Sequence, residues 1–177
     1  MSFLSEVQAA APQIRVRMRK ADSFDEIVPA MLLCSLQLAG GDAAKGRQVA
    51  SAAAPIAETA DVKPWNPGMH TEPGDFVTAP QGGQVYIYTG KDAMTHANQG
   101  FYPGAAGVYY WSPVPKMHEG NRIFPDIPGI VVYVKNNELW WDPSIERLYR
   151  WTGGDYDCPS NFYPGAAGVH QWTDRIF

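Results

Sequence analysis

The chain has 177 residues and a formal net charge of −4, and 45% of its residues are hydrophobic, 12% aromatic and only 18% charged. This balance argues against wholesale disorder, and without a cationic excess we expect no binding to nucleic-acid phosphates. No run of about 18 apolar residues is present, so we expect no membrane insertion. Two cysteines, Cys34 and Cys158, are too few and too far apart for a disulfide scaffold or a zinc site.

The first region, residues 1–62, is rich in alanine and predicts helices with a short strand before them. In residues 13–20, apolar side chains alternate with arginines, a period of two that is typical of a half-exposed strand. Ser23 and Glu26 have the spacing of a capping box. The apolar segment 27–39 that follows predicts a helix.

Two glycines, Gly40 and Gly41, are expected to end this helix. Asp42 then has the position of a cap for a second short helix, which we expect to continue to about Ala54 and to end at Pro55.

The helical segment carries an apolar stripe that has no obvious partner within so short a region. Its members are Ile27, Met31, Leu32, Leu36 and Leu38. Burying such side chains is worth roughly 1.5–3 kcal/mol each. We therefore expect a homo-oligomer, with a trimer as the favoured form, or attachment to another protein.

An internal duplication is the strongest pattern in the sequence. Residues 101–111 and 162–172 are identical at nine of eleven positions and share the run Phe-Tyr-Pro-Gly-Ala-Ala-Gly-Val. Upstream, Tyr86 and Tyr149 occupy matching positions in the same register. The duplication predicts two related modules, residues 65–114 and 130–177, joined by a linker over residues 115–129.

Each module reads as a small β unit, because short apolar and aromatic runs are separated by Pro, Gly and Asn turns. The fold class expected is therefore mainly β, with two tandem β modules after a helical region. Modules of this size bury little surface by themselves.

The first module resembles the small chitin-binding modules of carbohydrate-binding families 5 and 12. The residues that carry the likeness are Trp65-Asn-Pro-Gly, Gly74-Asp75 with Val77, Tyr86, Pro103-Gly104 and the closing Trp111. The second module keeps most of this pattern but has Asn137-Glu138 in place of the Gly-Asp pair. Such modules occur on secreted chitinases and in bacteriophage virion proteins, where an alanine-rich helical region precedes two tandem units, as it does here.

The resemblance implies that exposed aromatic rings stack on the faces of sugar rings. The candidates are Tyr88, Tyr109 and Tyr110 in the first module and Trp140, Trp141, Trp151 and Tyr156 in the second. Trp151 and Tyr88 are the rings most expected to be exposed. Trp140 and Trp141 are adjacent on a strand, so one of them should face the core. Core positions are assigned to Trp65, Trp111, Trp172, Tyr86 and Tyr149.

No arrangement of residues predicts catalysis, a metal or a cofactor. The four histidines, His70, His96, His118 and His170, lack metal-ligand spacing and are expected in solvated loops. Asp92, Asp155 and Asp157 lie in loops, with no cleft that would pair an acid with a nucleophile.

The function expected is that of a non-enzymatic protein on the surface of a bacteriophage virion, displayed as a capsid decoration, head fibre or tail accessory. Residues 1–62 would attach to other virion proteins, and the two modules would bind a host or surface polysaccharide. The alternatives are a secreted chitin-binding protein and a purely structural virion component that binds no sugar.

Overall fold

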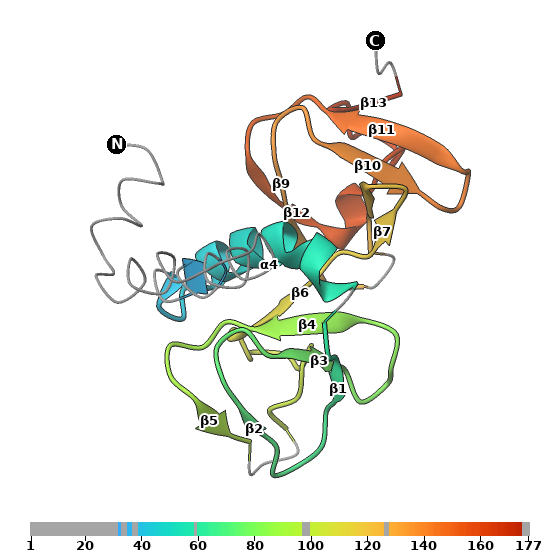
Figure 1. Cartoon of the computed structure of the whole chain (residues 1–177). Helices are drawn as coiled ribbons and strands as arrows, with labels where there is room; N and C mark the ends of the chain where they lie inside the picture. The colour runs from blue at the N-terminus through green and yellow to red at the C-terminus, as the bar shows by residue number, and fades with distance from the viewer. Residues whose placement is uncertain are drawn as a thin grey trace, which may run out of the picture.

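The structure is a computed structural model, and it describes residues 32, 35, 36, 39–58, 60–96, 100–125 and 128–174. The protein is mainly β, and a helix precedes the strands (Figure 1). The helix is α4 (Ala43–Ala57), and the strands of the first module are β1 (Lys63–Pro64), β2 (His70–Thr71), β3 (Phe76–Thr78), β4 (Val85–Tyr88), β5 (Met94–Thr95) and β6 (Trp111–Pro113). The second module contains β7 (Met117–His118), β8 (Asn121–Ile123), β9 (Val131–Val134), β10 (Leu139–Asp142), β11 (Arg147–Trp151), β12 (Tyr156–Pro159), the 3-10 turn η1 (Ser160–Phe162) and β13 (Trp172–Thr173).

The two modules share one topology. In the first, β1, β3, β4 and β6 form a sheet in that order, with β1 parallel to β3 and the other pairs antiparallel. In the second, β8, β10, β11 and β13 repeat this order and these directions, and β7 extends the sheet at the β8 edge. Each module adds a two-stranded antiparallel sheet, β2 with β5 and β9 with β12.

The second module begins earlier than the duplication indicates. Strands β7 and β8 lie in the segment 115–129, which was expected to be a linker, and both pair into the sheet of the second module. The prediction of a linker was wrong here because β8 is short and polar and carries no periodic pattern, although it repeats the parallel pairing of β1.

The repeated loops adopt the same backbone path, as the duplication predicts. The amides of Ala105 and Ala166 donate to the carbonyls of Tyr102 and Tyr163, each at 3.0 Å. The closing tryptophans repeat this agreement, because the indole nitrogens of Trp111 and Trp172 donate to the carbonyls of Phe101 and Phe162, at 3.3 and 2.6 Å.

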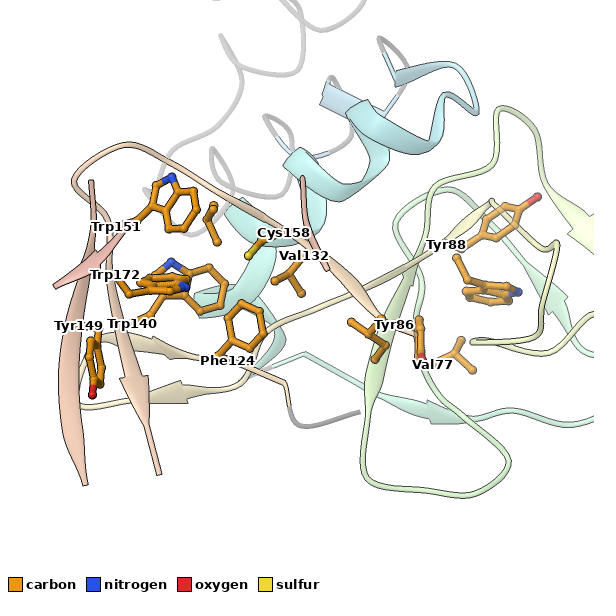
Figure 2. Close-up of a cluster of buried hydrophobic side chains, with 13 residues drawn as sticks. Val77, Tyr86, Tyr88, Phe124, Val132, Trp140, Tyr149, Trp151, Cys158 and Trp172 are labelled. Atoms are coloured by element: carbon orange, nitrogen blue, oxygen red, sulfur yellow. The ribbon is translucent and has the colours of Figure 1, made fainter. Parts of the chain in front are cut away.

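Aromatic side chains from both modules belong to one buried hydrophobic cluster. Figure 2 shows the indoles of Trp140, Trp151 and Trp172 gathered together in the second module, beside Phe124. The expected core positions Trp111, Trp172, Tyr86 and Tyr149 are buried, and Trp65 is half-buried against the same cluster.

Helix α4 begins where the sequence predicts and ends later. Asp42 caps it by accepting a hydrogen bond from the amide of Lys45 at 2.9 Å. The expected end at Pro55 was wrong, since the helix continues to Ala57. A proline lacks the amide that would bond the carbonyl four residues earlier. That carbonyl, of Ser51, instead accepts two hydrogen bonds from Arg122.

Helix α4 lies between the two modules and contacts both (Figure 1). Toward the first module it packs against β4 and β6, where Gly46 comes so close that an added Cβ would lie 2.8 Å from Ser112 Oγ. Toward the second module it packs against β9, and Arg47 forms a two-point ion pair with Asp157 at 2.9 and 2.6 Å.

The apolar stripe before α4 has a partner inside the chain. Leu36 is buried and Leu32 half-buried in a cluster with residues of α4 and the outer face of the first sheet, such as Phe76 and Ile87. The premise that the stripe lacks a partner was therefore wrong for these two leucines. Ile27, Met31 and Leu38, the strand predicted at residues 13–20 and the start of the helix at 27–39 lie outside the described residues.

Candidate functional site

Three of the rings predicted to bind sugars are buried. Tyr88 is 1% exposed, Trp151 3% and Trp140 0%. The expected exposure of Tyr88 and Trp151 was wrong because each lies two residues after a core tyrosine, and residues two apart in a strand face the same side of the sheet. These rings fill the cores and present no face to a sugar.

The remaining predicted rings lie at or near the surface in separate places. Trp141 faces away from Trp140, as expected for neighbours in a strand, and stacks on His118 at 4.6 Å between ring centroids. Tyr109 is 69% exposed. Tyr156 is exposed and stacks on Trp151 at 6.1 Å, and Tyr110 is half-buried with its ring 5.6 Å from that of Tyr88.

A polar cluster occupies the core of the first module where the second module is apolar. The His96 ring is buried, and its Nε2 and Thr71 Oγ1 share a hydrogen bond of 2.6 Å. Strand pairing places Val134 and Cys158 at the matching positions of the second module. The expectation of a solvated His96 was wrong, whereas His70, His118 and His170 are exposed. Burial lowers the pKa of His96 and raises the pKa of Cys158 to about 12.

The loop carboxylates of the second module have structural partners. Asp155 accepts hydrogen bonds from the amide of Asn136 at 3.0 Å and from the hydroxyl of Tyr133 at 2.9 Å. These bonds, that of the amide above all, lower the pKa of Asp155, whereas burial and the same hydrogen bond raise the pKa of Tyr133 to about 12. Asp157 pairs with Arg47.

A pocket of about 330 Å³ opens in the second module, between the end of β8, the turn that joins β10 to β11, and the loop after η1. Its lining residues are Phe124, Pro125, Asp142, Pro143, Ser144, Ser160, Tyr163 and Pro164. Phe124 and Pro164 are buried and form an apolar part of the wall, while Tyr163 is 49% exposed. The pocket thus combines an accessible ring with apolar walls and polar groups.

The polar side chains that line the pocket are hydrogen-bonded to other groups of the chain. Asp142 Oδ1 accepts hydrogen bonds from the amide and the hydroxyl of Ser144, at 2.9 and 2.6 Å. Ser160 Oγ accepts one from the amide of Gly129 at 3.1 Å. One oxygen of Asp142 and the hydroxyl oxygen of Ser160 thus each have a partner within the chain.

The first module carries a different set of residues at the matching place. Strand pairing aligns Trp65 with Phe124 and Ala79 with Asp142, and the repeated loop aligns Tyr102 with Tyr163. The rings of Trp65 and Tyr102 meet edge to face, with centroids 6.1 Å apart. The carboxylate is thus peculiar to the second module.

The prediction from sequence missed every residue that lines this pocket. Tyr163 belongs to the repeated Tyr-Pro-Gly loop, and Asp142-Pro143-Ser144 is a recognisable turn, so both segments carried a signal. Their meeting depends on long-range packing that the sequence does not display.

Within the described part of the chain, no group of three or more His, Cys, Asp or Glu side chains could hold a metal ion. No helix there has the length and apolar character to cross a membrane. The chain matches no protein-family model, no curated protein and no solved structure.

Proposed function

We propose that this protein binds carbohydrate without modifying it and that the pocket of the second module is its binding site. The observation that carries the proposal is the combination of an exposed Tyr163 ring, apolar walls and the oriented Asp142 and Ser160 side chains in one pocket. A sugar ring has a C–H-rich face that packs on aromatic rings and hydroxyls that bond to carboxylates and hydroxyls.

The number of carboxylates supports binding without hydrolysis. Glycosidases place two carboxyl groups on either side of the bond that they cleave. Asp142 is the one carboxylate among the described residues that line this pocket.

The proposal includes display on a bacteriophage particle, with residues 1–62 attached to other virion proteins and the chain in a homo-oligomer. The order of a helical region followed by two β modules supports this setting. Immunogold labelling of particles, followed by electron microscopy, tests it. Labelling of a secreted fraction instead would favour the free chitin-binding alternative, and labelled particles without sugar binding would favour the structural one.

Retention of the full chain on insoluble polysaccharides tests the binding itself. We expect retention on at least one of chitin, peptidoglycan or capsular polysaccharide, and a loss of about tenfold in the Tyr163→Ala variant, because aromatic anchors dominate such contacts. Tyr109→Ala is the matched control, since Tyr109 is exposed but lies outside the pocket. Equal losses in both variants, or retention on none of the surfaces, would overturn the proposal.

A further inference from the structure

Among the described residues that line the pocket, one is charged and none offers a counter-charge. Asp142 is 8% exposed and is the one charged residue in the described lining. Its Oδ1 takes both hydrogen bonds from Ser144, and Oδ2 receives none from the described residues. Arg147 lies opposite Asp142 in the strand pairing, but its guanidinium pairs with Asp174 at 3.0 Å.

The surroundings of this carboxylate make its charge selective. It has lost most of its contact with water, and apolar walls beside it reduce the screening of its field. A ligand with a positive group regains the lost solvation by pairing with Oδ2. A ligand with a negative group meets repulsion and no cation in the described lining, so the pocket discriminates against it.

We propose, on the basis of the carbohydrate-binding function above, that this pocket selects an amino sugar whose free ammonium group lies against Asp142 Oδ2, with the sugar face on Tyr163. Acidic sugars are rejected. The first module has Ala79 at the matching position and contributes no such selection, so the two modules differ in what they recognise.

Calorimetric titration of the full chain with three oligosaccharides of equal length tests this selection. The probes are an oligomer of glucosamine, its fully N-acetylated form and an oligomer of a uronic acid, at a mildly acidic pH where the amines are protonated. We expect the glucosamine oligomer to bind about tenfold more tightly than the N-acetylated one, in the range of a charge-assisted hydrogen bond. We expect no binding of the uronic acid.

The outcomes separate this proposal from the one on which it rests. Equal or tighter binding of the N-acetylated oligomer, or binding of the uronic acid, would overturn the selection but leave carbohydrate binding standing. If none of the three oligomers binds, the proposed selection for amino sugars is overturned. If the protein is also not retained on any of the insoluble polysaccharides, the proposed carbohydrate binding is overturned as well.

Variants test whether the Asp142 carboxylate causes the preference for the amino sugar. Asp142→Asn keeps an oxygen for Ser144 but removes the charge, and we expect it to abolish the preference for the amino sugar. Asp61→Asn is the control, because Asp61 is exposed and outside the pocket. Should Asp142→Asn fail to fold, the unchanged protein at an alkaline pH, where the amines of the ligand lose their protons, gives the second readout, since the preference for the amino sugar should then disappear. A preference that is the same at both pH values would contradict the proposal.

Discussion

The carbonyl oxygen of Ser51 in α4 accepts two hydrogen bonds from the guanidinium of Arg122 in β8, 3.0 Å from Nε and 2.9 Å from Nη2. The carbonyl is available because Pro55, four residues later, has no amide to give it. The same guanidinium pairs with Glu138, and Glu138 Oε2 accepts the indole hydrogen of Trp140 at 3.0 Å. One arginine thus joins the helix to the core of the second module.

Replacing this arginine should be costly. We expect Arg122→Met to lower the free energy of unfolding by about 2–3 kcal/mol, because Glu138 and the Ser51 carbonyl would lose their partner. In a Pro55→Ala background the new amide can bond Ser51, so the cost should fall by about 1 kcal/mol. Urea unfolding of the four proteins measures this coupling, and strictly additive values would contradict it.

The Trp151→Ala variant should lose stability. A buried indole replaced by alanine leaves a cavity, and we expect the free energy of unfolding to fall by about 3–5 kcal/mol. Urea unfolding, monitored by near-ultraviolet circular dichroism, measures this loss. Tyr109→Ala, at an exposed ring, should change stability by no more than about 0.5 kcal/mol. A Trp151→Ala protein with an unchanged unfolding midpoint would show that the ring is not part of the core.

The first module should be sensitive to mild acid. Burial, with a smaller effect from His70, lowers the pKa of His96 below its ordinary 6.5. The unfolded chain therefore binds a proton at a higher pH than the folded chain does, so stability is full above about pH 6.5 and falls as the pH drops toward the folded pKa. The rings around His96 are those of Tyr88, Tyr110 and Trp111, none of which offers a negative charge to a protonated imidazole.

The urea midpoint measured at several pH values from neutrality down to about pH 5 checks this expectation. Asp42 and Asp155 do not affect stability in this pH range. Their pKa values in the folded protein are lowered from 3.8, so their contributions to stability are lost only in stronger acid. A Thr71→Val, His96→Cys double variant has the residues of the second module at these positions, and its urea midpoint should no longer depend on pH in this range. His170→Gln, at an exposed histidine, should keep it.

Alanine at the matching loop glycines should be tolerated unequally. Gly104 and Gly165 have φ values of +86° and +81°, where a Cβ costs roughly 1–2 kcal/mol. An added Cβ would lie 2.6 Å from Tyr86 Oη at Gly104 but 3.1 Å from Tyr149 Oη at Gly165. We expect Gly104→Ala to cost about 1 kcal/mol more than Gly165→Ala. Gly107→Ala, where φ is +78° and nothing lies within 4 Å, isolates the backbone contribution. Equal costs at all three would show that the tyrosine contacts do not matter.

Local patterns in the sequence were sufficient for part of the fold. The Asp42 cap, the end of the preceding helix at Gly40 and Gly41, and the duplicated loops all depend on residues within a few positions of one another, and all were predicted. The continuation of α4 past Pro55 depends on Arg122, which lies 71 residues from Ser51, and no local pattern reveals that partner.

The candidate site was less accessible to such reasoning. A pattern of aromatic residues does not show which rings are exposed, and Trp151 was assigned to the surface although its spacing from Tyr149 puts both on the core face. The pocket brings together Phe124, Asp142 and Tyr163 from three separate segments. Only the packing of β8 and the loop after η1 around the β10–β11 turn makes them neighbours.

The position of α4 between the modules has a mechanical consequence. A force applied to a ligand bound in the second module would not be transmitted through the chain segment between β6 and β7 alone. It would also load the Arg47–Asp157 and Arg122–Ser51 contacts, and through the helix reach the sheet of the first module. The helix and both modules would then share the load with the chain segment between β6 and β7.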